Sequence, residues 1–386
     1  MKKMKMTILN LPMDLVAEIV SRLPMSSMRA SSATSEGETR MIMLMDCNLF
    51  LIRVVFKGTD IDPSTEQIGK LTCLNDSDQV AISQVFHCEG LVLCISKDGT
   101  RFVVWNPYLG QTRWIEPRYT HRNRLHEYDR FIYALGYENK ESCRSYKLLR
   151  FIDFGYKHLP RYEIYDFDSD LWTDLDVTPH WRIWFNKRGV SLEGNTYYCA
   201  SKRNSEEEGL NDHIICFDYT SERFGPLLAL PFSAGCDEDY VTLSCVREKK
   251  LVALLSHNEV NPYEIDIWIT TKIEPQNVSW SKFLALDTEP HGHSIEDSLF
   301  IDEEKKVVMC VNKYRHWNRH TLDIIGHAGY FRELDLGEPD SRNCRPHVCA
   351  YVPRSVQIKQ PARGQRKQEI KQPARGQRKQ ESNLEN

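Results

Sequence analysis

The chain has 386 residues, a length that allows one large domain or two ordinary ones with room for a hydrophobic core. Its composition is typical of a soluble globular protein, with 41% hydrophobic and 27% charged residues and a formal net charge of -4 at pH 7. This charge gives no reason to expect nucleic acid or a membrane surface as the main partner. No hydrophobic run approaches the length that would span a bilayer.

An amphipathic helix is predicted at residues 11–24, LPMDLVAEIVSRLP. Its hydrophobic residues recur at helical spacing and form one face: Leu15, Val16, Ile19, Val20 and Leu23. Asp14, Glu18 and Arg22 form the other face, with the acids early and the base late, as the helix dipole favours. A helix of this kind is most often part of a core. Its place at the N-terminus, outside the β pattern that follows, favours a docking element instead.

These residues resemble the first half of an F-box, the motif that docks a ubiquitin-ligase subunit onto a Skp-type adaptor. A helix that binds in a groove needs hydrophobic anchors one helical turn apart. The resemblance assigns adaptor binding to six residues: Leu11, Pro12, Leu15, Ile19, Leu23 and Pro24. It covers a partial F-box at residues 8–34. After Ala30 the chain runs into the polar segment SSATSEGETR instead of a third helix, so the motif is truncated after its first half.

The same N-terminus does not read as a secretion signal, because Asp14 and Glu18 interrupt its hydrophobic stretch. We therefore expect a protein of the nucleus, the cytoplasm or both that is not secreted. The twelve cysteines are scattered without a C-x-x-C pair, which indicates buried free thiols. His291-Gly292-His293 lacks cysteine or acidic partners at metal-ligand spacing, so neither a metal nor another cofactor is expected.

A repeated unit follows in the body of the chain, from about Met41 to Val352. Each unit is a hydrophobic strand, a polar turn and a second strand with an aromatic residue, as in VVWNPYLGQTRWI and EIYDFDSDLWTDLD. Aligned at their turns, the units recur at intervals of about 50 to 60 residues. The aligned turn positions are Asp46, Asn106, Asp166, Asp218, Thr270 and about Ile325. An Asp or Asn side chain suits such a turn because it can accept a hydrogen bond from the backbone two residues on.

A second hairpin lies between successive units, around turns such as Lys97-Asp98-Gly99 and Glu193-Gly194-Asn195. Two hairpins per repeat make four strands, which is one propeller blade. The sequence thus predicts a mainly β fold with a small N-terminal α part, in which short F-box-like helices precede a six-bladed propeller. Two stacked sheets remain the alternative. The propeller alignment also predicts equivalent buried positions for four aromatic residues: Trp105, Tyr165, Phe217 and Trp268.

Seven segments of the body, in order and at matching spacing, resemble the plant F-box-associated (type 1) interaction domain. They include WNPYLGQTRWI, GVSLEGNTYYCAS and FIDEEKKVVMCV, and the resemblance covers residues 40–356. Together with the partial F-box, it implies a substrate-recognition subunit of an SCF-type ubiquitin ligase. Its partners would be a Skp-type adaptor, through it a cullin ligase, and a protein target that the sequence does not identify.

The tail, residues 357–386, has a different character. IKQPARGQRKQE at residues 358–369 is repeated without change at 370–381. We expect this segment to be disordered, since it is polar and contains Pro and Gly. Residues 358–386 carry eight basic and three acidic residues. A nuclear-targeting or anion-binding role is one interpretation, and a solvated extension without a role is the one favoured, because the basic residues of each copy are too few for a strong cluster.

No motif indicates catalysis: the chain has no G-x-S-x-G, no phosphate-binding Gly-rich loop and no H-E-x-x-H. The expected function is therefore non-catalytic binding. The alternative to the ligase subunit is a stand-alone interaction propeller, or a non-functional gene copy, that has lost adaptor binding.

Overall fold

The computed structural model describes residues 38–56, 63–70, 80–118, 131–139, 144–152, 160–183, 188–203, 213–232, 240–256, 264–274, 276–287, 299–312, 319–337 and 346–361. The predicted helix at 11–24 and the rest of the partial F-box lie outside these ranges, as does the tail from residue 362. Within them, a 3-10 turn, η2 (His327–Gly329), supplies the helical structure. No helix in these ranges is long and hydrophobic enough to cross a membrane.

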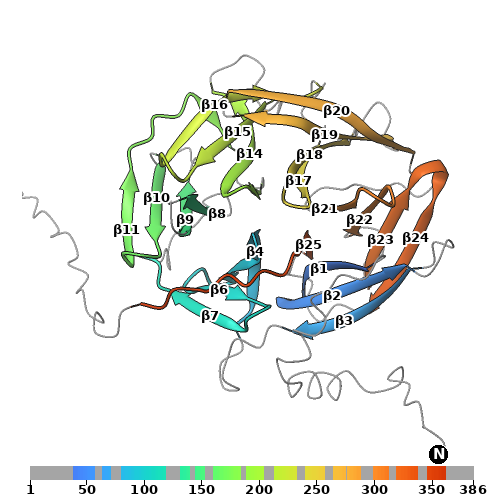
Figure 1. Ribbon diagram of the computed structural model, residues 1–386, viewed down its shortest axis with the longest axis horizontal. Helices are drawn as coiled ribbons and strands as arrows, with labels where there is room; N and C mark the ends of the chain where they lie inside the picture. The colour runs from blue at the N-terminus through green and yellow to red at the C-terminus, as the bar shows by residue number, and fades with distance from the viewer. Residues whose placement is uncertain are drawn as a thin grey trace, which may run out of the picture.

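Six antiparallel sheets in the described chain surround a central axis as the blades of a propeller (Figure 1). Blade 2 contains β4 (Ile82–Cys88), β5 (Leu91–Ser96), β6 (Phe102–Asn106) and β7 (Gln111–Ile115). Blade 3 contains β8 (Ile132–Asn139), β9 (Arg144–Ile152), β10 (Arg161–Asp166) and β11 (Leu171–Leu175). Blade 4 contains β12 (Trp181–Arg182), β13 (Val190–Leu192), β14 (Asn195–Lys202), β15 (His213–Asp218) and β16 (Arg223–Ala229). In blades 2 and 3 the earliest strand is innermost, and in blade 4 both β12 and β13 pair with β14 on its inner side. In all three blades the last strand is at the rim.

The next two blades follow the same order. Blade 5 contains β17 (Tyr240–Val246), β18 (Lys250–Ser256), β19 (Glu264–Glu274) and β20 (Asn277–Asp287). Blade 6 contains β21 (Leu299–Asp302), β22 (Val307–Asn312), β23 (His320–Gly326) and β24 (Phe331–Gly337). The six-bladed propeller predicted from the repeats is therefore confirmed.

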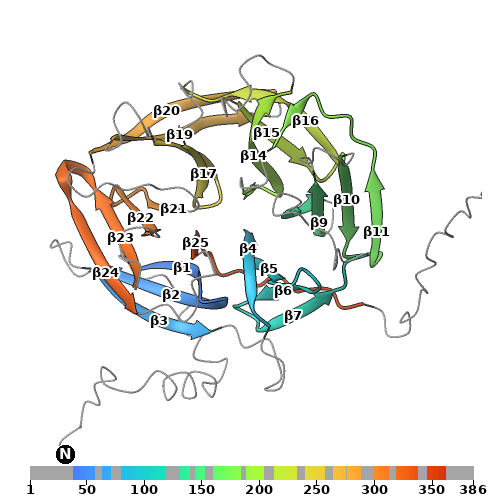
Figure 2. The ribbon, with the colours of Figure 1, turned by 180° about the vertical axis from the view of Figure 1, so that it is seen from behind.

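Blade 1 is assembled from both ends of the described chain, and this closes the ring (Figure 2). It contains β1 (Glu38–Met45), β2 (Asn48–Phe56) and β3 (Pro63–Lys70), with β25 (His347–Ala350) as its innermost strand. β25 runs antiparallel to β1, with Val348 opposite Met43 and Cys349 opposite Ile42. The strands that complete this sheet are thus about 300 residues apart in the sequence, which makes closure a long-range pairing.

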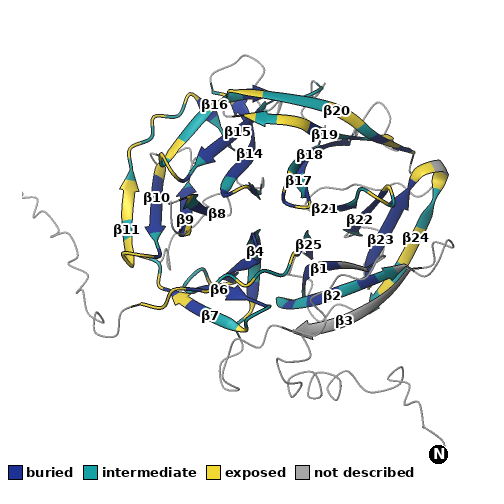
Figure 3. Ribbon diagram, in the orientation of Figure 1, coloured by how far each residue is buried: buried dark blue, intermediate teal, exposed yellow. Residues whose placement is uncertain are grey.

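The hydrophobic core is divided among the six interfaces between neighbouring blades. The inner and middle strands are mostly buried, whereas outer strands such as β11 and β24 have exposed positions (Figure 3). β1 shows why the strands are hydrophobic runs rather than alternating patterns. Ile42 and Leu44 pack against blade 2, whereas Met41 and Met43 pack against blade 6. Because successive side chains of a strand point to opposite faces, a sheet that is buried on both faces needs hydrophobic residues at consecutive positions.

The first repeat was aligned incorrectly. The turn at Asp46 joins β1 to β2, the second and third strands of blade 1, whereas the turns at Asn106, Asp166 and Asp218 join the third strand of a blade to its outermost strand. The reason is the closing strand β25, which takes the innermost place in blade 1 and shifts the other strands outward by one. The turns at Lys97-Asp98-Gly99 and Glu193-Gly194, predicted to be equivalent, also occupy different places in their blades. The first joins the second and third strands of blade 2, whereas the second joins β13 to β14.

The aromatic alignment holds at three of its four positions. Trp105, Tyr165 and Phe217 each precede the turn residue of the third strand, and their side chains are buried. Trp268 is only partly buried. Thr270, expected at its turn, lies inside β19, because β19 and β20 are each 11 residues long and contain two bulges that displace the turn beyond Glu274.

The described cysteines are free thiols. Cys94, Cys199, Cys216 and Cys310, which lie in strands, are buried as expected, and Cys245 is partly exposed. Burial raises the pKa of Cys216 to about 12, so this thiol stays protonated at neutral pH. Such cysteines behave as small hydrophobic residues of the core rather than as nucleophiles.

Replacing Val348 by Asp should prevent the ring from closing. Val348 is 1% exposed between blades 1 and 6, and a carboxylate there has no partner. We expect the free energy of unfolding to fall by about 3–5 kcal/mol, the scale for an uncompensated buried charge. Val352→Asp is the matched control, because Val352 is 36% exposed and follows the same strand. Urea denaturation monitored by tryptophan fluorescence would measure both, and equal losses in the two variants would contradict the closing role of β25.

Candidate interaction site at the ends of the inner strands

Charged side chains from three blades and from the chain after β25 meet at one end of the innermost strands. His87 is near the end of β4, Glu89 follows it, Arg144 begins β9 and Glu248 follows β17. Arg354 reaches the same place from the segment that follows β25. We call these five residues the mouth cluster, because they lie where the inner strands end, beside the central cavity that His87 lines.

Glu89 is the centre of one half of the mouth cluster. Its Oε1 accepts a hydrogen bond of 2.6 Å from the Tyr137 hydroxyl, and its Oε2 lies 2.5 Å from Nη1 of Arg144. Arg144 also stacks over the Tyr137 ring, with its guanidinium carbon 4.4 Å from the ring centre. The Glu89 side chain is 9% exposed and that of Arg144 is 37% exposed, so the carboxylate is buried behind a guanidinium that faces solvent.

Glu248 and Arg354 form the other half. Nε and Nη2 of Arg354 donate to Oε2 of Glu248 at 3.0 and 2.6 Å. Nη1 of Arg354 lies 3.6 Å from Glu89, so the two halves share this cation. Burial raises the pKa of Glu248 above its ordinary value, and Arg354 opposes that rise.

His87 is held in its neutral form. Its Nε2 accepts a hydrogen bond of 3.1 Å from the Gly90 N–H, so this nitrogen has no proton to offer Glu248 Oε1, 3.5 Å away. Burial, assisted by the positive charge of Arg354, lowers the pKa of His87 to about 4.

The Glu89–Gly90 turn lets the mouth cluster pack this closely. Both residues have positive φ, 42° and 83°, as the two central residues of a tight hairpin require. A Cβ on Gly90 would lie 2.7 Å from the Cβ of Arg354, so only glycine allows residue 354 to pass directly over this turn. The sequence reading did not identify this turn, although the Glu-Gly pair between two hydrophobic strands was a signal for it.

Residues 351–361, which we call the strap, leave the centre and cross blade 2 towards blade 3 (Figure 1). Asn106, fully buried, fixes the strap: its Nδ2 donates to the carbonyl oxygens of Arg354 and Val356 at 3.0 and 2.6 Å. Its Oδ1 accepts from the backbone N–H groups of Tyr108 and Leu109. An aspartate could accept those two bonds but could not donate to the strap, which gives this turn a reason to carry Asn where others carry Asp.

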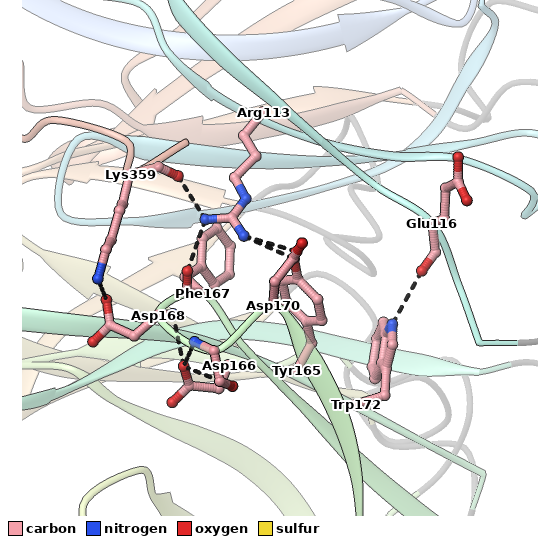
Figure 4. A network of polar contacts seen from close by, with 10 residues as sticks. Arg113, Glu116, Tyr165, Asp166, Phe167, Asp168, Asp170, Trp172 and Lys359 are labelled. Atoms are coloured by element: carbon pink, nitrogen blue, oxygen red, sulfur yellow. Dashed lines mark hydrogen bonds and ion pairs between the residues drawn. The ribbon is translucent and has the colours of Figure 1, made fainter. Parts of the chain in front are cut away.

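The outer part of the strap lies against Arg113, a buried side chain of β7 that links blades 2 and 3 (Figure 4). Its Nη1 donates to the carbonyls of Phe167 and Lys359 at 2.9 and 2.5 Å. Its Nη2 donates to Asp170 Oδ1 at 3.0 Å. The strap therefore packs on the propeller beyond residue 356, where the sequence analysis had ended the domain, and Ile358 is 5% exposed.

A similar link joins blades 3 and 4. Nζ of Lys147 donates to the carbonyl of Tyr219 at 3.3 Å and to Glu222 at 2.7 Å. Phe167 and Tyr219 directly follow the turn residues Asp166 and Asp218, and Asp170 and Glu222 lie four residues after them. The turns after Asp166 and Asp218 thus bind a cation of the preceding blade in the same way, through the carbonyl of the next residue and the carboxylate four residues on.

Beside the mouth cluster the inner strands line a partly open cavity of about 70 Å³, large enough for a few water molecules. Arg188, His347, Cys245 and Cys349 line it. Burial, with Arg188 nearby, lowers the pKa of His347 well below its ordinary value. Burial also raises the pKa of Cys245 and of Cys349 to about 12. The imidazole of His347 and the thiols of Cys245 and Cys349 are therefore uncharged at neutral pH.

The chemistry that the mouth cluster offers is recognition rather than proton transfer. Its acids are neutralised by guanidinium groups, its histidine is neutral, and the thiols beside it are protonated. Arg144 and Arg354 remain 37% and 38% exposed in fixed orientations, as a binding surface requires. Among the described residues, no group of three or more His, Cys, Asp or Glu could hold a metal ion.

The residues predicted to bind an adaptor, Leu11, Pro12, Leu15, Ile19, Leu23 and Pro24, lie outside the described residues. None of the mouth cluster or of the cations that link the blades was singled out from the sequence. Arg113 and Lys147 lie in strands next to hydrophobic residues. A cation at such a position was the sequence signal for a buried polar link between blades.

Comparison with known proteins identifies the family. The family model for the F-box associated beta propeller domain matches residues 40–358. The chain belongs to this family. Plant proteins named as F-box proteins are similar to this chain over most of its length.

F-box/kelch-repeat protein At4g33290 of Arabidopsis thaliana is 53% identical, over 94% of this chain and 92% of the relative. F-box protein At2g38590 of the same plant is 50% identical, over 93% of this chain and 92% of the relative. Among solved structures, a chain of a nidogen/laminin complex gives a TM-score of 0.41 at 11% identity, covering 81% of this chain and 99% of that chain. A likeness at that level carries no functional information.

Asn106→Asp should detach the strap, because a carboxylate would face two carbonyl oxygens in a buried site. We expect a loss of about 2–4 kcal/mol in the free energy of unfolding, the scale for buried polar groups left without partners. Asp218→Asn is the matched control at the equivalent turn of blade 4. There Oδ1 accepts from the Thr220 N–H and Oδ2 accepts from the Ser221 hydroxyl. An amide can accept the first bond with its oxygen and donate to the Ser221 oxygen with its nitrogen. Thermal unfolding of the two variants would test this, and a control as unstable as Asn106→Asp would rule out the special role of Asn106.

His87 should make the protein less stable in mild acid. Its pKa is about 4 in the folded protein and 6.5 for a free histidine, so the unfolded chain binds the extra proton. The stabilisation is complete above pH 6.5 and is lost as the pH falls towards 4, and it should decrease by roughly 2 kcal/mol between pH 7 and pH 5. His87→Gln should flatten this dependence, whereas replacing exposed His180 should not. Parallel stability curves for the wild type and His87→Gln, from urea denaturation at pH 7, 6 and 5, would contradict the assignment.

Proposed function

We propose that this protein is the substrate-recognition subunit of an SCF-type ubiquitin ligase. The observation that carries the proposal is the F-box associated propeller at residues 40–358, preceded by a sequence that resembles half of an F-box and found in relatives named F-box proteins. The N-terminal segment would dock a Skp-type adaptor and through it a cullin ligase. The propeller would hold the protein to be ubiquitinated.

The adaptor contact would use one face of the predicted helix. Leu11, Leu15, Ile19 and Leu23 recur every four residues, the spacing of anchors on a helix that binds in a groove. The motif lacks its second half after Ala30, so the remaining helices would have to be ordered on binding, which costs affinity. We therefore expect a weaker adaptor contact than that of a complete F-box.

The target contact would lie on the propeller, and the mouth cluster is the described surface that we assign to it. Arg144 and Arg354 present fixed guanidinium groups there, next to buried carboxylates that hold them in place. The chain itself would be non-catalytic: the other subunits would transfer ubiquitin, and this one would bring the target near them. Such a role places the protein in the nucleus, the cytoplasm or both.

The alternative is a propeller without an adaptor, either a stand-alone interaction module or a non-functional gene copy. The truncation of the F-box after Ala30 is the observation that favours it. The two functions differ in one measurable property, which is the capture of a Skp-type adaptor by the intact chain.

Leu15→Ala combined with Ile19→Ala should weaken adaptor capture by at least tenfold, because two central anchors of the interface are removed. The melting temperature of the propeller should stay unchanged. The matched control is Asp14→Ala with Glu18→Ala on the opposite face of the same helix, which should capture the adaptor nearly as well as the wild type. Pull-down with a purified Skp-type adaptor and a thermal melt of each variant would measure both properties.

Two outcomes would count against the proposal. If the wild-type chain captures no adaptor, the stand-alone function is favoured. If the Leu15/Ile19 variant unfolds the propeller, the helix belongs to the core and does not dock a partner. The target would be sought separately, among the proteins that accumulate when this chain is removed from the plant.

A further inference from the structure

The end of the strap packs where blades 2 and 3 meet, and we call the surface that it covers the groove. Ile358 is 5% exposed and packs in the hydrophobic cluster between these blades, with Ile115 and Phe167 among its members. The groove wall formed by β7 supplies Gln111, Thr112 and Arg113, and the wall formed by the turn after β10 supplies Phe167 and Asp168. This is how a short extended peptide is held, with one buried side chain and several backbone contacts.

Polar contacts on either side of Ile358 fix the peptide in one register. The Ile358 N–H donates to Oε1 of Gln111 at 2.9 Å, and the Lys359 carbonyl accepts from Arg113 at 2.5 Å. Nε2 of Gln360 donates to the Thr112 carbonyl at 3.1 Å. Nζ of Lys359 lies 2.9 Å from Asp168, on the solvent side (Figure 4). The groove thus contacts the side chains of Ile358, Lys359 and Gln360 and the backbone that joins them.

The same sequence occurs a second time in the chain. Residues 358–369 and 370–381 are identical, so Ile370, Lys371 and Gln372 carry each side chain that the groove contacts at 358–360. Every local contact that the first copy makes is chemically available to the second. The two copies differ only in the length of chain that connects them to the fixed part of the strap.

We propose that this groove is a peptide-binding site with two intramolecular ligands, and that residues 370–373 occupy it when residues 358–361 are released. The first copy is favoured because it directly follows Val356 and Arg354, which Asn106 and Glu248 hold in place. The second copy must close a loop that is 12 residues longer. Loop closure becomes unfavourable only slowly with length, so a second tethered copy remains an effective ligand.

Ile should dominate the recognition and Lys should contribute little. Ile358 is buried, whereas the side chains of Lys359 and Asp168 are 64% and 34% exposed, and exposed ion pairs contribute little to binding. The informative substitution is therefore at the isoleucine of each copy, where a carboxylate would have to enter a hydrophobic cluster.

Three variants of the full chain test the proposal by thermal unfolding: Ile358→Asp, Ile370→Asp and the double variant. Ile370→Asp should melt like the wild type, because its copy is not bound while the first is intact. Ile358→Asp should melt lower, and the double variant should melt lower again by roughly two degrees or more, because no second copy remains to fill the groove. Equal melting temperatures for Ile358→Asp and the double variant would overturn the proposal.

Two further measurements keep the test decisive. If Ile358→Asp does not fold, Ile358→Ala with and without Ile370→Ala gives the same comparison with a milder change. A synthetic peptide of residues 370–381, added to the folded double variant, should raise its melting temperature, and the same peptide with Asp in place of Ile should not. A rescue by the second copy that increases with protein concentration would overturn the intramolecular arrangement, since the occupant would then come from another chain.

Discussion

Every blade of this protein is buried on both faces, and the rest of the structure depends on that constraint. The six hydrophobic clusters lie between blades and none lies within a single blade, so each sheet relies on its two neighbours for its core. An open ring would expose two hydrophobic faces at once. The closing strand β25 prevents this by pairing with β1, so that Val348 lies beside Met43 in the cluster between blades 1 and 6.

Polar links between blades accompany this hydrophobic closure. Arg113 and Lys147 are buried cations that each have partners in the next blade, and Arg354 joins the strap to blades 2 and 5. A buried cation is costly unless its partners are in place, so these side chains favour one spacing of the blades over others. The mouth cluster is the part of this network that reaches solvent, and its rigidity follows from the same contacts.

Much of the fold could be predicted from the sequence, because the hydrophobic runs and the Asn or Asp turns recur at a regular interval. Asn106, Asp166 and Asp218 are at equivalent turns as expected, and their aromatic neighbours are buried. The position of Asp46 could not be predicted correctly, since a hairpin between second and third strands has the same local pattern as one between third and fourth strands. Only the pairing of β25 with β1, a contact between distant segments, decides between them.

The site was much less predictable than the fold. Glu89, Arg144, Glu248 and Arg354 are distant in the sequence and meet only because four inner strands end at the same place. In the sequence, Asn at position 106 and Asp at the other turns appeared interchangeable. The structure shows that the two N–H groups of the Asn106 amide hold the strap, and a carboxylate has no such donors. Likewise, the exact repeat in the tail gave no sign that its first copy begins inside a groove of the propeller.

The pairing of β25 with β1 also sets the order of events during protein synthesis. The first blade to leave the ribosome cannot be completed until residues 347–350 have been made, so β1, β2 and β3 must wait for almost the entire chain. Meanwhile the hydrophobic side chains of β1 that will face blade 6 have nothing to cover them. A premature stop codon anywhere before residue 347 would leave every product with an unfinished first blade. For such truncated products, exposure of this surface to chaperones and proteases would determine their fate more than any loss of the binding site.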